Sequence, residues 1–449
     1  MRDDVGEAIR REAAPFQPNG GGMDALVEAV REARLVLVGE ASHGTHEFYA
    51  ARAELTRRLI AGHGFNLVAL EADWPDAYRI NQFVRGGDPQ AAGGSHDTAQ
   101  AALDDFTRFP RWMWRNDDVV AFVAWLREHN RARPPAERAG VYGLDLYSLH
   151  RSIDAVLAYL GKVDPGAARQ ARERYACFDH FGDDPQAYGY ASSFGFSRDC
   201  EDEVTSQPME LRRRAMDYAN RDGRIAEDEY FFAEQNARLV ANAETYYRAM
   251  FGGRSESWNL RDRHMHETLE ALLAHVTRTS GRARAVVWAH NSHLGDARAT
   301  EMGRGGELNL GQLVRERHGD DAWLVGFTTH TGTVTAARNW DEPAEKRQVM
   351  PSLPGSYERL FHDTGVGNFW LRLRDGAARE PLGPERLERA IGVIYRPDTE
   401  RGSHYFRASL PAQFDAVVHI DRTSALSPLE RWAAEEHAVD LPDTFPSGV

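Results

Sequence analysis

Lysine and cysteine are almost absent from this 449-residue sequence. Only Lys162 and Lys346 are lysines among its 54 basic residues, and neither lies in a G-x-x-x-x-G-K-S/T phosphate-binding loop. The two cysteines, Cys177 and Cys200, are too few for a disulfide scaffold; they could pair, but we expect reduced thiols. The sequence therefore encodes neither a phosphate-loop protein nor a small disulfide-stapled fold.

Long apolar runs are also missing. No segment approaches the roughly 18 consecutive apolar residues of a membrane-spanning helix, and the N-terminus, MRDDVGEAIRREAAPF, is charged where a signal peptide is apolar. The 68 acidic residues outnumber the basic ones and give a net charge of −14. Because contacts to phosphates need clustered cations, we expect neither a nucleic-acid nor a membrane partner. The sequence predicts a cytoplasmic globular protein that acts on a small molecule.

Short apolar runs that are typical of buried strands alternate with helical patterns. The four clearest runs are Leu35–Val38, Leu67–Leu70, Val141–Leu144 and Ala285–Ala289. Apolar residues recur at helical spacing after the first run, and Asn116 is placed to cap a helix before the third. This alternation predicts an α/β fold with a mainly parallel central sheet flanked by helices. Further strands are expected at Trp323–Phe327, Phe369–Leu373, Ala390–Tyr395 and Ala416–Ile420.

The strand pattern stops between about residues 150 and 282. Long charged helical segments take its place, such as Arg212–Arg221 and Glu227–Met250, together with clusters of tyrosine and phenylalanine. We interpret residues 150–282 as a helical insertion that covers a cleft. Residues 1–149 and 283–449 then form the α/β catalytic core, with a loosely packed tail from about Leu429.

Ionisable side chains follow each of the four clearest strands. Because ligands of open parallel sheets bind beyond the carboxyl ends of the strands, we expect these side chains to share one rim. A single one of them could be a helix cap or a turn residue, but four strand ends of similar chemistry favour a functional site. The residues are Glu40, His43, His46 and Glu47 after the first strand, Glu71 and Asp73 after the second, Asp145 after the third, and His290 and His293 after the fourth.

Several familiar catalytic motifs are absent. There is no G-x-S-x-G nucleophile elbow, no H-E-x-x-H zinc motif, and no G-x-G-x-x-G after a strand, so a dinucleotide cofactor is not expected. What is present is a set of histidines and carboxylates without an evident nucleophile. This set favours water activated by a general base.

The same segments resemble the erythromycin esterase family. The resemblance rests on GEASHGTHEFYAARAEL, GFNLVALEADWPDAYRIN, WMWRNDDV, NLRDRHM, AHNSHLG and PSLPGSYERLFHD, which together span most of the chain. It implies an α/β core with a helical part over the cleft. It also implies metal-independent hydrolysis of an ester, which in the founding members is a macrolide lactone, and it therefore carries an expectation of antibiotic resistance.

The resemblance also implies roles for individual residues. The general base of the family falls on His43, and the glutamates of its two motifs fall on Glu40 and Glu71. Its helix arginine falls on Arg52, for which a salt bridge to Glu47 is the alternative. The remaining family positions fall on His290, His293 and Arg261.

The mechanism that we expect is direct attack by water on an ester carbonyl. His43 takes the proton of the water, Glu40 or Glu71 orients the imidazole or the water, and His290, His293 or an arginine stabilises the oxyanion. We expect no cofactor. Six further residues are candidates for substrate binding or for support of the catalytic groups: His46, Glu47, Asp73, Trp112, Trp114 and Asp145.

Two other functions use the same residues. Two H-x-x-H pairs, His43/His46 and His290/His293, have the ligand chemistry of a zinc or manganese site, so a hydrolase with a divalent metal is the first alternative. A non-catalytic protein that binds a small molecule or haem in the same cleft is the second. The histidine–carboxylate cluster fits this second alternative less well, because a binding protein needs no base.

Overall fold

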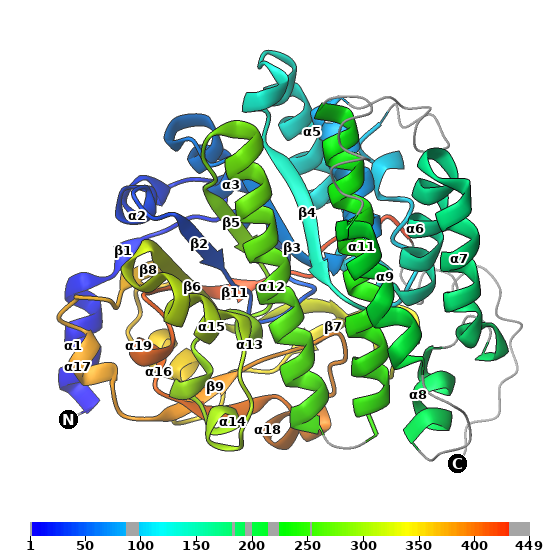
Figure 1. The fold of residues 1–449 in the computed structure, drawn as a ribbon. Coiled ribbons are helices and arrows are strands. Elements are labelled where there is room, and N and C mark those ends of the chain that lie inside the picture. Colours follow the sequence, from blue (N-terminus) through cyan, green and yellow to red (C-terminus); the bar gives the residue numbers. More distant parts are fainter. Residues whose placement is uncertain are drawn as a thin grey trace, which may run out of the picture.

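A nine-stranded sheet runs through the computed structural model of the chain, which describes residues 2–86, 98–181, 185–193, 200–213, 224–251 and 254–430 (Figure 1). Its spatial order is β1-β8-β11-β6-β2-β5-β3-β4, with β7 paired to β6. The strands are β1 Ala14–Pro15, β2 Leu35–Val38, β3 Leu67–Asp73, β4 Gly140–Asp145, β5 Ala285–Trp288, β6 Ala322–Ala336, β7 Glu345–Val349, β8 Phe369–Arg372 and β11 Ala416–Thr423. A separate antiparallel pair joins β9 Arg386–Arg389 to β10 Tyr405–Ala408.

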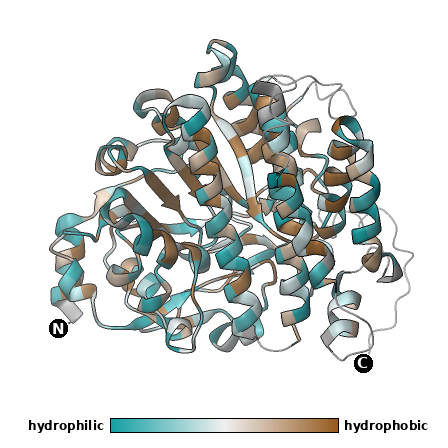
Figure 2. Ribbon diagram, in the orientation of Figure 1, coloured by the Kyte–Doolittle hydropathy of each residue, from teal (hydrophilic) through white to brown (hydrophobic). Residues whose placement is uncertain are grey.

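The predicted α/β fold and mainly parallel sheet are confirmed. Strands β11, β6, β2, β5, β3 and β4 pair in parallel, and only β1, β7 and β8 run antiparallel to their neighbours. Alternate residues of β2 enter different apolar clusters: Leu35 and Leu37 face one cluster, and Val36 and Val38 face the other. Both faces of the sheet are therefore covered, which explains why its central strands are continuously apolar (Figure 2).

Most of the predicted strands match the structure, but one does not. The four clearest runs form β2, β3, β4 and β5, and the later runs at 323–327, 369–373 and 416–420 fall in β6, β8 and β11. The strand predicted at Ala390–Tyr395 is wrong. That segment is extended and makes isolated bridges, Ile391 with Ser42 and Ile394 with Ala337, without a continuous ladder, while β9 ends just before it.

Helices surround the sheet on both sides and continue through residues 150–282 (Figure 1). In the core they are α1 Arg2–Glu12, α2 Met23–Val30, α3 His46–His63, α4 Trp74–Arg85, α5 Asp117–Arg131, α13 Asn291–Leu294, α14 Glu301–Arg304, α15 Leu310–His318, α16 Tyr357–Asp363, α17 Arg379–Leu382, α18 Glu400–Ser403 and α19 Leu410–Gln413. Asn116 caps α5 as predicted, because its side-chain oxygen accepts a hydrogen bond from Val119 N at 3.0 Å.

The segment 150–282 contains no strand within its described residues. Its helices are α6 Leu149–Val163, α7 Pro165–Tyr175, α8 Pro185–Ser193, α9 Glu201–Arg213, α11 Arg224–Ala249 and α12 Arg254–Ser280. The helical segment predicted at Arg212–Arg221 begins in α9 and then passes outside the described residues, as does the tail beyond residue 430. In Figure 1, α6, α7 and α9 lie beyond the β4 edge, α12 crosses one face of the sheet, and α11 packs between α12 and α6.

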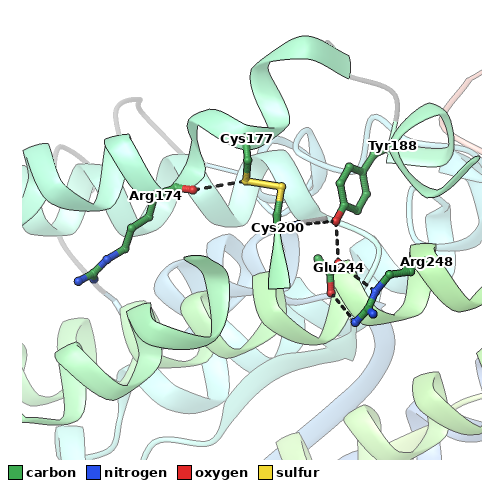
Figure 3. The surroundings of a disulfide bond; sticks show 6 residues. All are labelled: Arg174, Cys177, Tyr188, Cys200, Glu244 and Arg248. Atoms are coloured by element: carbon green, nitrogen blue, oxygen red, sulfur yellow. Dashed lines mark hydrogen bonds and ion pairs between the residues drawn. A yellow bond between two sulfur atoms is a disulfide. The ribbon is translucent and has the colours of Figure 1, made fainter. Parts of the chain in front are cut away.

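The expectation of reduced thiols is corrected by the structure. Cys177 and Cys200 form a disulfide that ties the start of α9 to the turn after α7 (Figure 3). The neighbouring Tyr188 accepts a hydrogen bond from Cys200 N at 2.9 Å and donates one to the Glu244 carboxylate at 2.6 Å. Two cysteines are enough for one bridge because the fold brings them together across 23 residues, which their number alone could not show.

Candidate active site

A cleft of about 510 Å³ opens at the carboxyl ends of the parallel strands. It is lined from β3, β4, the segment after β5, the insertion helix α12, and the chain around residues 106–114, 297–309 and 390–406. His43, Glu71, Asp145, His290 and His293 all line it. The predicted convergence of four strand ends on one rim is thus observed. Asp73, Trp114 and Arg261 line the same cleft, while Glu40 and Arg52 lie behind His43 and do not reach the cavity.

The loop after β2 holds His43 in place through close backbone packing. Gly39 N donates to Val325 O at 2.8 Å, and Asn291 N donates to Glu40 O at 2.8 Å, so the loop is tied to β6 and to the segment after β5. Gly44 passes so near the Thr335 carbonyl that a Cβ atom there would overlap it. A side chain at that position would push His43 away from its carboxylate.

His43 forms a buried chain of charge with Glu40 and Arg52. His43 Nδ1 lies 2.9 Å from Glu40 Oε1, and Arg52 Nη2 lies 2.8 Å from Glu40 Oε2. The side chains of Glu40 and Arg52 are fully buried, and the guanidinium of Arg52 sits over the Tyr49 ring at 4.3 Å. Because an ionised carboxylate only accepts, the Nδ1 of His43 carries the proton and its Nε2 is left as a base. The alternative pairing of Arg52 with Glu47 is not observed.

His290 has the opposite tautomer. Its Nδ1 accepts a hydrogen bond from Ser292 N at 3.3 Å and lies 2.8 Å from Ser292 Oγ, so with the hydroxyl as donor a neutral ring carries its proton on Nε2. Burial and, to a smaller extent, His43 lower the pKa of His290 to about 3, although Glu71 opposes the shift, so the ring is neutral at pH 7. The Nε2 atom is buried and has no hydrogen-bond partner among the described residues. The rings of His43 and His290 lie 4.8 Å apart, and both residues line the cleft.

Glu71 and Arg261 connect the other strand ends. Arg261 Nη2 lies 2.7 Å from Glu71 Oε1 and 2.6 Å from Asp145 Oδ2, and its Nε lies 3.0 Å from Asp145 Oδ1. The second oxygen of Glu71 accepts a hydrogen bond from His290 N at 2.8 Å. Burial opposes the charge of Glu71, but His293 and Arg261 outweigh burial and hold the pKa of Glu71 well below its usual range. Glu71 is therefore ionised and fixes the backbone of His290.

The other predicted residues divide between the cleft and its surroundings. Asp73 lines the cleft and pairs with Arg108, whose Nε lies 3.0 Å from Asp73 Oδ2. Trp114 lines it also, whereas Trp112 is buried and does not. His46 points away from the cavity to Asp118 at 2.8 Å, and Glu47 accepts hydrogen bonds from Ser424 N and Oγ. His46 and Glu47 thus begin α3 outside the cleft.

Sequence reasoning missed several residues that line the cleft or contact its lining residues. Asp262 lies 2.9 Å from His293 Nδ1, Trp258 stacks on the His293 ring at 4.4 Å, and Tyr147 lies under the guanidinium of Arg261 at 4.9 Å. Trp258, Arg261 and Asp262 have the i, i+3, i+4 spacing of one helix face, which was a usable signal. Arg108 lies on a loop without periodicity and gave no signal.

The described residues hold neither a metal-ligand cluster nor a membrane-spanning helix. In them, no three His, Cys, Asp or Glu side chains are placed to hold a metal ion. None of their helices combines the length and the apolar composition that crossing a bilayer requires.

Comparison with known proteins decides the family. The model of the erythromycin esterase family matches residues 60–423, well over half of the chain. The chain belongs to the erythromycin esterase family. Membership supports hydrolase function at the level of the family, and it confirms the resemblance that the sequence motifs indicated.

Two relatives of this erythromycin esterase family member cover most of its length. Erythromycin esterase type II of Escherichia coli is 23% identical over 418 residues, which cover 89% of this chain and 92% of the relative. The putative hydrolase YbfO of Bacillus subtilis (strain 168) is 22% identical over 374 residues, which cover 79% of this chain and 78% of the relative.

Solved structures confirm the fold of this family member. A succinoglycan biosynthesis protein superposes with a TM-score of 0.74 at 20% identity, over 95% of this chain and 98% of the other. An erythromycin esterase mutant in its open conformation superposes with a TM-score of 0.65 at 17% identity, over 92% and 97% of the two chains. At these identities the likeness is one of fold.

Proposed function

We infer that this protein hydrolyses an ester or a macrolide lactone with a water molecule that His43 activates, without a metal or another cofactor. The observation that carries this proposal is a pair of histidines in one cleft whose Nδ1 contacts favour opposite tautomers. His43 presents an unprotonated Nε2 because Glu40 holds its Nδ1 proton, and His290 presents an Nε2–H because its Nδ1 accepts from Ser292. Addition of water to a carbonyl needs a base and a hydrogen-bond donor in one cleft, and we assign these roles to His43 and His290.

The first step joins the oxygen of water to the ester carbonyl carbon. His43 Nε2 takes a proton from the water, and Glu40 and Arg52 stabilise the imidazolium that forms, because their buried ion pair keeps the carboxylate fixed at Nδ1. The carbonyl electrons move to oxygen, and His290 Nε2–H donates to that oxyanion. A single oxyanion donor of this kind is worth about 2.7–4 kcal/mol in the transition state.

The second step breaks the bond between the carbonyl carbon and the alcohol oxygen. The oxyanion reforms the carbonyl, and His43 returns its proton to the departing alkoxide, so the products are an acid and an alcohol and the enzyme regains its first state. Glu71 supports both steps without proton transfer, because its Oε2 holds His290 N and its Oε1 is held by Arg261. In a lactone the acid and the alcohol remain parts of one opened chain.

The substrate class is supported by the cleft and by the relatives. A cavity of about 510 Å³ with aromatic walls at Phe106, Phe109, Trp114, Tyr147 and Trp258 suits a large, mostly apolar molecule. Erythromycin esterases of Escherichia coli are among the relatives, so macrolides are placed among the substrates to be tested. Opening a macrolide ring would inactivate an antibiotic, and a resistance role would then follow.

A panel of esters and lactones, macrolides included, tests the proposal. We expect hydrolysis by the wild type and a loss of about 10²–10⁴-fold in kcat for His43→Gln. His46→Gln is the matched control, because His46 is three residues away but contacts Asp118 outside the cleft. Comparable turnover by the wild type and His43→Gln, or no turnover on any member of the panel, would overturn the assignment.

A further inference from the structure

One face of insertion helix α12 meets the rim of the sheet. Trp258, Arg261 and Asp262 lie on this face, and all three contact His293, which follows β5. Trp258 stacks on the ring at 4.4 Å with an interplanar angle of 7°. The ring of His293 is thereby clamped between the helical insertion and the catalytic core.

Asp262 is the most deeply fixed member of this face. Its side chain is fully buried, and its two oxygens lie 3.0 and 2.9 Å from His293 Nδ1. Oδ1 also accepts a hydrogen bond from Leu310 N, at the start of α15, at 2.8 Å. The His293 Nδ1–H donor and its carboxylate thus form a second histidine–carboxylate pair, in addition to that of His43 and Glu40.

The other nitrogen of His293 has two competing neighbours. His293 Nε2 lies 3.3 Å from Glu71 Oε1 and 2.9 Å from Arg261 Nη1. When Nε2 carries a proton it donates to Glu71, and when it is bare it accepts from Arg261. The charge of His293 therefore decides whether the ring supports Glu71 or Arg261.

We propose that Asp262 is a positioning residue of the active site, which keeps His293 charged so that Nε2 donates to Glu71 and Glu71 in turn holds the backbone of His290. This proposal rests on the proposed function, because His290 is the oxyanion donor there. Asp262 contacts no substrate. It acts through His293 and Glu71, and it links the position of the insertion to the geometry of the oxyanion site.

The charges around His293 support this role. Burial and the charge of Arg261 both disfavour a charged His293 ring. The carboxylates of Asp262 and Glu71 outweigh them and raise the pKa of His293 to about 9. The ring is then protonated at pH 7 and loses its proton as the pH rises through 9. The groups that face it are Asp262 and Arg261 from α12, Glu71 from β3, and His290 from its own segment.

Nitrogen NMR of the full chain labelled with ¹⁵N-histidine tests the proposal directly. The His293 signals are assigned by their absence from His293→Gln. We expect both ring nitrogens of His293 to be protonated at pH 7.5 in the wild type. In Asp262→Asn we expect the titration midpoint of His293 to fall by about one to three pH units, the effect of removing an opposite charge at this distance.

Asp262→Asn is the conservative variant because the amide oxygen can keep the bond to Leu310 N while the charge is lost. Asp228→Asn is the matched control. Asp228 lies 2.8 Å from the ring of His275, which, like Asp262, is on α12. The His275 ring stacks on Phe231 at 4.0 Å, much as His293 stacks on Trp258. None of Asp228, His275 and Phe231 lines the cleft. The control should leave the His293 titration unchanged.

Kinetics on any substrate that the panel identifies add a second measurement. We expect Asp262→Asn to lower kcat about 10²-fold with little change in KM, and to move the alkaline limb of the kcat profile to lower pH. The NMR result stands even if no substrate is found, so failure of the proposed function and failure of this proposal are distinguishable. A neutral His293 in the wild type at pH 7.5, or an unchanged midpoint in Asp262→Asn, would overturn the proposal.

Discussion

At the scale of single residues, the buried ion pair of Arg52 and Glu40 is the most demanding feature of the site. Both side chains are inaccessible to solvent, so removal of one partner leaves the other as an uncompensated charge. We expect Arg52→Gln to lower the free energy of unfolding by about 3–5 kcal/mol, measured by urea denaturation. This loss of stability should be larger than that caused by replacing an arginine on the exposed surface of α3.

Arg58 offers the comparison on the same helix. It is partly exposed and pairs with Glu54 at 2.7 Å, so Arg58→Gln should change the free energy of unfolding by less than about 1 kcal/mol. Equal effects of the two substitutions would mean that the Arg52–Glu40 pair is hydrated in solution and that His43 lacks the fixed carboxylate assigned to it.

The low pKa of His290 makes the stability of the protein depend on pH. The ring titrates at about 3 in the folded chain and at about 6.5 when unfolded, so between these values the unfolded chain binds the extra proton. Stability is therefore full above pH 6.5 and declines as the pH falls toward 3. From pH 7 to pH 5 this group alone should remove about 2 kcal/mol.

Denaturation of the wild type and of His290→Asn at these two pH values isolates that contribution. The variant should lose about 2 kcal/mol less than the wild type between pH 7 and pH 5, because asparagine does not titrate. His264, whose pKa burial also lowers to about 3, still titrates in the variant, so a residual pH dependence is expected. Identical pH dependence in both proteins would show that the His290 ring is hydrated.

At the scale of elements, a disulfide joins two parts of the segment 150–282, although we expected reduced thiols from the small number of cysteines. Cys177 and Cys200 are 23 residues apart, and a crosslink over a loop of this length stabilises a fold by about 3 kcal/mol through the unfolded chain. We expect the double variant Cys177→Ser/Cys200→Ser to lower the thermal midpoint and to raise hydrogen exchange in α7 and α9. Protection of β2, β5 and β6 should be retained in native-state exchange.

A matched pair of measurements locates that effect. Reduction of the wild type with a thiol should reproduce the exchange pattern of the double variant, and adding the thiol to the double variant should change nothing further. Loss of protection in the sheet strands at the same rate would show instead that the insertion and the core unfold as one unit.

The elements also show where pattern reasoning works. Leu35–Val38 could be predicted to the residue because a central parallel strand is apolar on both faces and therefore reads as a continuous run. Ala390–Tyr395 carries the same residue types but fails, because Ile391 N bonds to Ala41 O and Ala337 N bonds to Val393 O across two separate neighbours. The local composition indicates a preference for an extended chain, but it does not indicate whether a partner strand lies beside that chain.

The residues of the active site also fall into those that the sequence pattern could predict and those that it could not. His43, Glu71 and His290 could be predicted because they follow strands, and the parallel topology brings strand ends together. Asp262 and Arg108 could not be placed by that rule, since a helix face and an irregular loop find the cleft only through tertiary packing. Trp258 was missed for the same reason, whereas Tyr147, which was also missed, lies just after β4.

At the scale of the whole molecule, the remaining issue is whether the cleft works with or without a metal. A catalytic zinc site takes three protein ligands and leaves one position open. In the described part of this cleft, the two oxygens of Glu71 accept hydrogen bonds from Arg261 and from His290 N. The two nitrogens of His293 contact Asp262 and Arg261. The two oxygens of Asp145 accept hydrogen bonds from Arg261 and from Leu146 N. Of these strand-end groups only the Nε2 atoms of His43 and His290 are left, and no three His, Cys, Asp or Glu side chains of the described residues are placed to hold a metal ion.

We therefore expect chelation to leave turnover unchanged. Purified protein dialysed against a strong chelator should hydrolyse the identified ester or lactone at the rate of untreated protein, and elemental analysis should find zinc and manganese far below one equivalent per chain. The physical reason is that a cation could bind only by displacing Arg261 or a protonated His293 from carboxylates they already neutralise. If activity is lost on dialysis and returns only when zinc or manganese is added, the proposal is wrong. His43 would then be a metal ligand and not the base that activates water.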